Sequence, residues 1–186
     1  NLFAKYFAVI GKNEFSNIIN PAEAFANAVA KPYQNTSSYA AESYRGKTVA
    51  VQGYQWHVLN KSENWITRAV RSEFAGSYII ERSGAQLFSL LKQIAGSVYA
   101  INASVLKNVG WGTSITEDFQ LTLNLYEKGF KVAYTPYIQA PSECVSTLKR
   151  LIRQRQRWAE GHSYNIKKHL HQLLTSSDMT QKEKWE

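Results

Sequence analysis

The chain has 186 residues, of which 44% are hydrophobic, so it is long enough for one well-packed core and too short for two domains that each have a sizeable core. Its formal net charge of +8 favours anionic partners such as nucleotides, nucleic acid or anionic lipid. The single cysteine, Cys144, excludes an internal disulfide and a cysteine-based zinc site, and no apolar run approaches the roughly 18 residues of a membrane span. Because the first residue is Asn1 and not Met, we expect the chain to come from within a longer polypeptide.

The first third of the chain predicts two strands with a helix between them. Residues 5–10, KYFAVI, form an apolar run typical of a buried strand. Residues 20–31 predict a helix, because an asparagine cap is followed by proline at the first helical position. Residues 47–54, KTVAVQGY, predict a second strand that ends at Gly53.

A long helical stretch is predicted next, after a polar loop. Residues 63–83 and 85–94 have helical patterns, and we expect two helices joined near Gly84. Trp65 and Phe74 are the expected core contacts of the first of these helices.

A short strand and a short helix are predicted after that pair. Residues 96–102, GSVYAIN, predict the strand, and residues 103–110 predict a helix that stops at Gly110. Gly96 and Gly53, taken alone, indicate only that the backbone turns tightly at these positions.

Two adjacent acids, Glu117 and Asp118, open the next predicted helix, which covers residues 117–128 and ends before Gly129. One interpretation is structural: Thr116 is a good N-cap, and acids in the first turn complement the exposed N–H groups. The other interpretation is chemical, because a loop that leads from a strand into a helix is where α/β proteins place their sites. The acids alone do not decide between the two.

The last elements are a strand at residues 130–135, a loop around Pro136 and Pro141, and a long helix at residues 147–173. Strands therefore alternate with helices, without repeats. This order predicts an α/β fold with a mixed, mostly parallel sheet.

The long helix combines apolar positions with a cluster of basic residues. Five cations fall within nine residues with no acid among them: Lys149, Arg150, Arg153, Arg155 and Arg157. Such a helix can lie on a membrane surface, with the cations toward anionic headgroups, or it can frame a phosphate-binding site.

Two short motifs carry a resemblance to a known family. The triplet Thr116–Asp118 reads T-E-D, and residues 154–158 read Q-R-Q-R-W, a Q-x-x-R-W sequence. Together with the upstream AVQGY and GSVYAINASVLKNVGW, they resemble the processive, membrane-bound family-2 glycosyltransferases, the group of the cellulose, chitin and hyaluronan synthases. The resemblance covers residues 5–170. It implies a partial GT-A-type domain: residues 1–145 would be its acceptor-side half, and residues 146–186 an amphipathic interfacial helix with a tail leading toward a membrane segment.

The resemblance also implies the reaction and its catalytic residues. The family transfers a sugar, with inversion, from a nucleotide-diphosphate donor to a hydroxyl of a growing polysaccharide. Asp118 matches the general base that accepts the proton of this hydroxyl, and Glu117 would orient the acceptor or the loop. Thr116 completes the triplet and is expected among the substrate-binding residues.

The remaining expected substrate contacts come from the second motif and from the loop before the short strand. Arg155 and Arg157 would stabilise the departing diphosphate, because their planar guanidinium groups offer forked donors. Trp158 would pack against the acceptor sugar, and Gln154 would contact phosphate or hydroxyl. Ser97 is expected at the acceptor entrance.

The family's divalent cation, Mg or Mn, is expected from the resemblance but has no obvious ligands in this sequence. Gly11, Lys12 and Asn13 follow the first predicted strand, where the family has an acidic D-x-D. Lys12 in place of the cation and a catalytically inactive protein both stay open. The helix histidines, at positions 162, 169 and 171, lack a metal-ligand spacing and are expected at the surface or an interface.

The predicted partners are a nucleotide-sugar donor, a glycan acceptor and, through the full-length protein, a membrane, with the chain at the cytoplasmic face of the cell membrane. Two alternatives to an enzyme remain. One is an inactive, glycosyltransferase-like binding protein, and the other is a basic nucleic-acid-binding module, for which the sequence has no recognised motif. Nucleic acid is therefore not among the expected partners.

Overall fold

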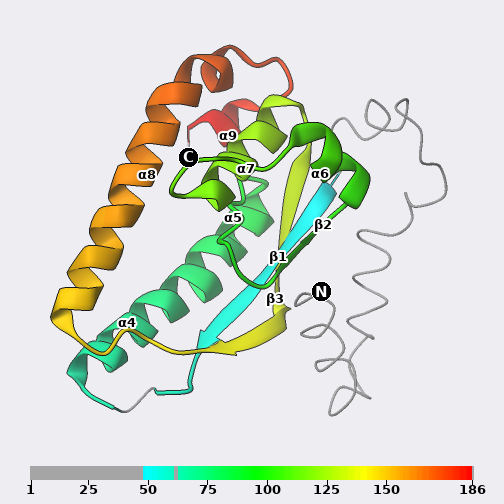
Figure 1. Cartoon of the computed structure of the whole chain (residues 1–186). Helices are drawn as coiled ribbons and strands as arrows, with labels where there is room; N and C mark the ends of the chain where they lie inside the picture. Colours follow the sequence, from blue (N-terminus) through cyan, green and yellow to red (C-terminus); the bar gives the residue numbers. More distant parts are fainter. Residues whose placement is uncertain (1–47, 61–62, 186) are drawn as a thin grey trace.

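The computed structural model describes residues 48–60 and 63–185 of the chain (Figure 1). Within this part, three strands form one sheet in the order β2-β1-β3, with β1 at Thr48–His57, β2 at Tyr99–Ile101 and β3 at Lys131–Ser142. β1 pairs antiparallel with β2 and parallel with β3. The predicted α/β class with a mixed sheet is confirmed. The strand and helix predicted at residues 5–10 and 20–31 lie outside the described residues.

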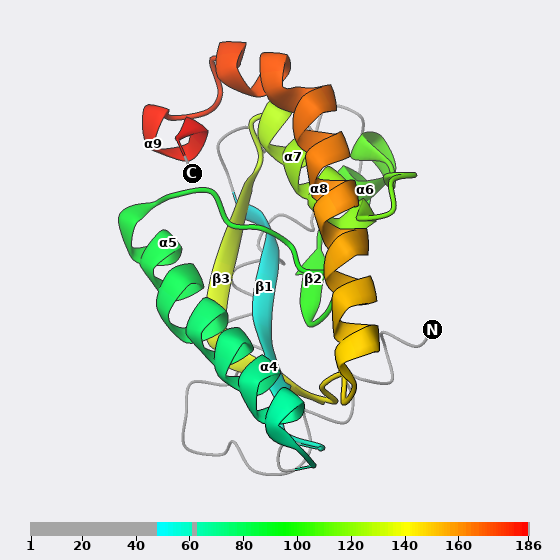
Figure 2. The same cartoon turned by 90° about the vertical axis from the view of Figure 1, so that its left-hand side faces the viewer.

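The helices pack mainly on one side of this sheet. Figure 1 shows α4, α5 and α8 on the same side, and Figure 2 views the molecule from that side. The bounds are α4 Trp65–Ala75, the π-helical η2 Gly76–Glu81, α5 Arg82–Phe88, α6 Ala103–Val109, α7 Glu117–Glu127, α8 Leu148–Thr175 and α9 Gln181–Lys184.

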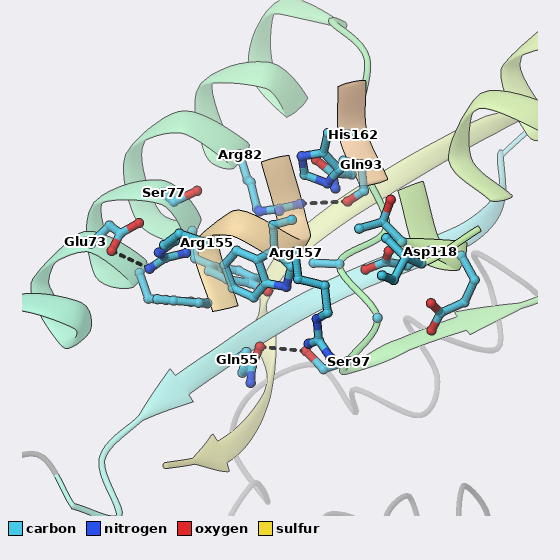
Figure 3. Close-up of a pocket in the computed structure, with 18 residues that line it drawn as sticks. Gln55, Glu73, Ser77, Arg82, Gln93, Ser97, Asp118, Arg155, Arg157 and His162 are labelled. Atoms are coloured by element: carbon cyan, nitrogen blue, oxygen red, sulfur yellow. Dashed lines mark hydrogen bonds and ion pairs between the residues drawn. The ribbon is translucent and has the colours of Figure 1, made fainter. Parts of the chain in front are cut away.

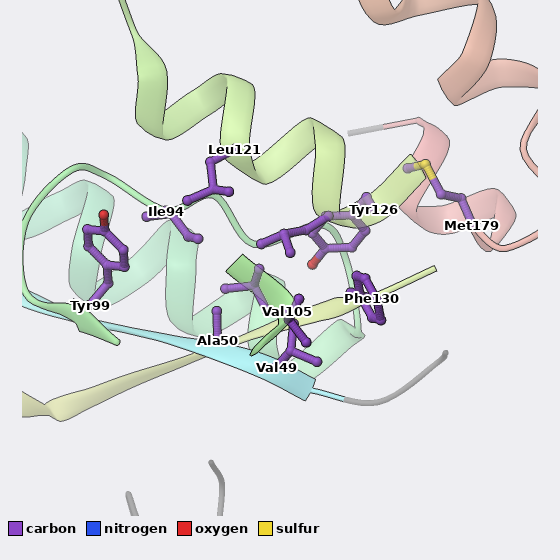
Figure 4. Close-up of a cluster of buried hydrophobic side chains, with 11 residues drawn as sticks. Val49, Ala50, Ile94, Tyr99, Val105, Leu121, Tyr126, Phe130 and Met179 are labelled. Carbon is purple, nitrogen blue, oxygen red and sulfur yellow. The ribbon is translucent and has the colours of Figure 1, made fainter. Parts of the chain in front are cut away.

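The largest core cluster lies where α7 packs on the sheet (Figure 4). Tyr126 and Leu125 of α7 are fully buried, and Tyr126 also accepts a hydrogen bond from the backbone N–H of Lys92 at 2.9 Å. Burial of this many apolar side chains makes α7 a fixed platform for its own N-terminus. The buried members of the cluster are Val49, Ala50, Ile94, Tyr99, Val105, Leu121, Leu125, Tyr126, Phe130, Val132 and Met179.

The prediction that the strand of residues 47–54 ends at Gly53 is wrong, since β1 continues to His57. Gly53 is a point of close approach: its N–H donates to the carbonyl of Val98 at 2.6 Å, and a Cβ at this position would lie 2.5 Å from the carbonyl oxygen of Ile138. Glycine is therefore required by the neighbouring backbone and does not terminate the strand.

The predicted loop around Pro136 and Pro141 is also wrong, because both prolines belong to β3. Gln52 pairs with Tyr134 but Tyr54 pairs with Gln139, so β3 carries extra residues opposite β1 at this point. Pro136 falls within this irregularity, where no ladder N–H is needed, and proline is tolerated there.

The two helices predicted around Gly84 form one continuous helical segment. A capping box at Asn64 starts it, and it runs through α4, η2 and α5 to Phe88, with Gly84 inside α5. The second predicted helix thus ends six residues early. Phe74 is partly buried against two core clusters, as expected, whereas Trp65 is 66% exposed and makes no core contribution.

Helix α6 ends at Gly110 as predicted, and α8 closely matches its predicted range. The buried residues of α8 are Gly161, Asn165 and His169, whereas apolar residues such as Leu148 and Ile166 are about half exposed. None of the helices in the described part of the chain is long and apolar enough to cross a membrane.

The segment after α8 folds back onto the domain. Met179 joins the largest core cluster, and the carboxylate of Glu183 in α9 accepts a 2.7 Å hydrogen bond from Nζ of Lys131 in β3. Thr180 caps α9 through its side chain. The structure therefore anchors this segment to the sheet.

Candidate functional site

One cavity of about 360 Å³ brings together the residues of both sequence motifs (Figure 3). It lies between the α4–η2–α5 segment, the loop before β2, the N-terminus of α7 and the first half of α8. Its lining residues are Gln55, Glu73, Phe74, Ser77, Tyr78, Arg82, Gln93, Ala95, Gly96, Ser97, Ile115, Thr116, Glu117, Asp118, Arg155, Arg157, Trp158 and His162.

Seven of the eight residues expected at a site from the sequence line this cavity. Gln154 is the exception. Helix α8 places its arginines and tryptophan on one wall, and the first turn of α7 places the two acids on another. Residues about forty positions apart in the sequence thus meet at one cavity, as the resemblance requires.

Asp118 is the half-buried acid of the pair. Its Oδ1 accepts the backbone N–H of Phe119 at 2.8 Å, and a Cβ on Gly96 would lie only 2.8 Å from its Oδ2. Burial raises the pKa of Asp118 above its ordinary value, and the nearby charge of Glu117 adds to the rise, while the Phe119 N–H and His162 oppose it. Glu117 itself is exposed. A desolvated carboxylate in a cavity is a candidate proton acceptor.

Thr116 precedes α7 as predicted, but its side chain does not cap the helix. It is buried and accepts a hydrogen bond from Nδ2 of Asn165 in α8 at 3.0 Å. The same Nδ2 lies 3.2 Å from the carbonyl of Thr116 and 3.0 Å from Oγ of Ser114. The threonine therefore connects the acidic turn to α8.

Gly161 completes this junction. A Cβ on Gly161 would lie 2.5 Å from Oγ1 of Thr116 and 2.6 Å from Cγ2 of Ile115, distances that real Cβ atoms do not adopt. Gly161 and the fully buried Asn165 thus let α8 lie directly against the residues that lead into the first turn of α7, where Asp118 lies.

Arg155 is held by its neighbours in the cavity wall. Its Nη2 lies 2.6 Å from Oε2 of Glu73, and its guanidinium lies 4.5 Å from the centre of the Trp158 ring and 5.6 Å from that of Phe74. Its charge is therefore compensated by a carboxylate that the sequence analysis did not identify. Arg157 is exposed, and it forms no ion pair with a carboxylate in the described part of the chain.

The loop of Ser97 is shaped by two glutamines of β1. Gln52 is fully buried: it donates to the carbonyl of Ser97 at 2.8 Å and accepts from the N–H of Ala95 at 2.8 Å. Ser97 donates to Oε1 of Gln55 at 2.8 Å. The next residue, Val98, has a φ of 51°, which is unusual for a β-branched residue. A polar residue inside the apolar run of β1 was the sequence signal for this role.

The histidines of α8 correct a sequence expectation. His162 is half-buried in the cavity and packs on the ring of Phe119, with 4.5 Å between the ring centres. Burial lowers the pKa of His162, and Asp118 partly offsets this effect. His169 is buried, and its Nδ1 lies 2.6 Å from Oε1 of Glu127. Only His171 has the exposed position that was expected.

The cavity carboxylates do not form a cation site on their own. Among the described residues there is no group of three or more His, Cys, Asp or Glu side chains that could hold a metal ion. Glu73 is bound to Arg155, which leaves Asp118 and Glu117. Gly11, Lys12 and Asn13 lie outside the described residues, so metal dependence stays a prediction.

Comparison with known proteins agrees with the motifs. Residues 37–181 match the family model described as glycosyl transferase family group 2. The chain is 29% identical over 130 residues to the probable glycosyltransferase YdaM of Bacillus subtilis (strain 168), a match that covers 69% of the chain and 31% of the relative.

A plant protein is similar over a comparable range. The glucomannan 4-beta-mannosyltransferase 7 of Arabidopsis thaliana is 27% identical over 143 residues, which cover 75% of the chain and 25% of that protein. The chain thus spans a quarter to a third of the length of these relatives. On the extent of the family match, the chain belongs to glycosyl transferase family group 2.

Proposed function

We propose that this chain forms the acceptor side of a catalytic site that moves a sugar, with inversion, from a nucleotide-diphosphate donor to a hydroxyl of a growing polysaccharide. The observation that carries the proposal is the position of Asp118: a half-buried carboxylate with a raised pKa lies in the cavity that both motifs line. The two relatives, whose names describe glycosyl and mannosyl transfer, support the same class of reaction.

Asp118 is the general base of this reaction. A sugar hydroxyl is a weak nucleophile, so its proton must be accepted while its oxygen bonds to the anomeric carbon and the bond to the diphosphate breaks. Burial raises the pKa of Asp118, which makes the ionised carboxylate a stronger base than an ordinary surface aspartate. Glu117, exposed at the cavity, orients the acceptor or the loop.

The α8 side of the cavity binds the substrates. Arg157, with no carboxylate partner in the described part of the chain, stabilises charge on the departing diphosphate. Trp158 offers an aromatic face to a sugar, although Arg155 stacks on this ring in the structure. Ser97, fixed by Gln55, contributes a hydroxyl at the acceptor entrance.

The processive subtype, the membrane association and the cytoplasmic-face location are further proposals about the full-length protein. They rest on the T-E-D and Q-x-x-R-W motifs and on α8, whose exposed apolar residues lie beside many cations. Such a surface fits the interface of an anionic membrane.

The test is transfer by the full-length protein in membranes, assayed across nucleotide-sugar donors with the Asp118→Asn variant. We expect a loss of at least about 100-fold, because general base catalysis contributes roughly 10²–10⁴-fold. Glu143→Gln, which removes an exposed carboxylate outside the cavity, should transfer normally. In the unmutated protein, transfer should fall as pH drops toward the pKa of Asp118, at a pH above the ordinary aspartate value of about 3.9.

Each contrary outcome has a defined meaning. Turnover by Asp118→Asn close to that of the unmutated protein would remove Asp118 from the base role. No transfer from any donor would favour the inactive, binding-protein alternative. Transfer that resists a chelator would support a site in which Lys12 stands in for the cation.

A further inference from the structure

The helix that faces α8 across the cavity carries a π-helical turn, and this turn changes which residue faces the cavity. The backbone N–H of Arg82 donates to the carbonyl of Ser77, five residues earlier. In a regular α-helix the same carbonyl would accept from Glu81, four residues on. Arg82 therefore lines the cavity with Ser77, and the exposed Glu81 does not. The π-helical turn thus places the cationic Arg82, and not the anionic Glu81, at this wall of the cavity.

Arg82 is held in a fixed orientation. Its Nη1 donates to the carbonyl of Gln93 at 2.6 Å, and its guanidinium lies 4.6 Å from the centre of the Tyr78 ring, which is 2% exposed (Figure 3). Its Nε is buried and has no hydrogen-bond acceptor in the structure. A buried donor without an acceptor costs free energy, so the guanidinium has hydrogen-bonding capacity that the described residues do not use.

The charge of Arg82 is also uncompensated by carboxylates of the described chain. Of the three arginines that line the cavity, Arg155 is paired with Glu73, whereas neither Arg82 nor Arg157 forms an ion pair with a described residue. Two arginines that have no carboxylate partner among the described residues thus line one cavity from opposite helices. A diphosphate carries at least two negative charges and needs more than one cation to bind it.

We propose that Arg82 binds the diphosphate of the nucleotide donor together with Arg157, so that the diphosphate lies between η2–α5 and α8. This proposal rests on the proposed function and adds a binding residue that neither motif contains. The forked guanidinium donates its free N–H groups to phosphate oxygens, and its contacts to Gln93 and Tyr78 hold it in place before the ligand arrives.

The test measures binding of inorganic pyrophosphate and of nucleoside diphosphates to the purified full-length protein by titration calorimetry. We expect Arg82→Gln to weaken pyrophosphate binding by at least about 10-fold, because a charged hydrogen-bonding pair is lost. Arg82→Lys keeps the charge but not the forked donors, so its affinity for pyrophosphate should lie between those of the unmutated protein and of Arg82→Gln. Arg68→Gln removes an exposed charge from α4 outside the cavity and should bind normally.

Binding separates this proposal from the base role of Asp118, because Asp118→Asn should still bind pyrophosphate. A purely structural Arg82 would lower the urea midpoint of Arg82→Gln and leave the pyrophosphate affinity of both Arg82 variants within about twofold of the unmutated protein. That result, or no binding of pyrophosphate by the unmutated protein, would overturn the proposal.

Discussion

Replacing Gly96 by alanine should lower both the stability of the domain and its transfer activity. Gly96 has a φ of 67°, a left-handed conformation that costs other residues about 1–2 kcal/mol. The added Cβ would also lie 2.8 Å from Oδ2 of Asp118, so the carboxylate has to move. With a urea m-value of about 2 kcal/mol/M, a loss of about 1.5 kcal/mol lowers the unfolding midpoint by roughly 0.7 M.

The effect on transfer should exceed the effect on stability. Displacing a catalytic group by about 1 Å can lower turnover roughly 100-fold, and Asp118 borders Gly96 directly. Urea denaturation followed by fluorescence gives the stability, and transfer by the full-length protein gives the activity at temperatures where the variant stays folded.

Gly84→Ala is the matched control for this experiment. Gly84 lies inside α5 with nothing within 4 Å of an added Cβ, so alanine should raise stability by about 0.5–1 kcal/mol and leave transfer unchanged. A Gly96→Ala variant that matches the unmutated protein in both assays would refute the contact between Gly96 and the Asp118 carboxylate.

Two further predictions concern the packing that supports the site. Burial alone would raise the pKa of Glu183, but hydrogen bonds from Lys131 and Thr180 outweigh this and hold the pKa below its usual range. Glu183→Gln should therefore cost about 1.5–3 kcal/mol near pH 7, and the difference from the unmutated protein should vanish as pH falls from the unfolded pKa of about 4.3 through the folded one; a pH-independent difference in urea midpoints would contradict this assignment. Tyr126→Phe should cost about 1–3 kcal/mol, because the backbone N–H of Lys92 loses its acceptor in the core; a thermal midpoint unchanged by the substitution would contradict the hydrogen bond.

Local signals predicted most of the helices. Glycine ends α6 as expected, and the helical periodicity places α7 and α8 within one or two residues of their observed bounds. The motifs predicted that α7 and α8 face the cavity, but not that the α4–η2–α5 segment does. These predictions succeed because capping, periodicity and short motifs depend on neighbouring residues only.

The errors arise from contacts between residues far apart in the sequence. Thr116 looks like an N-cap, but its side chain instead accepts a hydrogen bond from Asn165, which is 49 residues away. Pro136 looks like a loop residue, but a register shift against β1 accommodates it in β3. Gln154 belongs to a motif, yet the geometry of α8 keeps it out of the cavity.

The site residues that sequence reasoning missed have no motif of their own. Glu73 and Arg82 belong to a helix whose π-helical turn shifts the face by one residue, and no periodicity rule locates that shift in advance. His162 was expected at the surface or an interface because it lacks a metal-ligand spacing, and the sequence does not reveal its contact with Phe119 of another helix.

The close contact between Gly161 and Thr116 marks a pivot about which α8 can tilt, and this pivot lies next to the acidic turn. Gly161 lies at the middle of the 28-residue helix, so arms of roughly 20 Å extend on either side of the pivot. A small tilt of α8 therefore displaces its ends by far more than it displaces Asp118. Arg157, only one turn from the pivot, moves little with respect to the base, whereas Arg150 near the end of the helix moves most. A load applied to the ends of α8 would thus leave the spacing between base and nearest cation nearly constant.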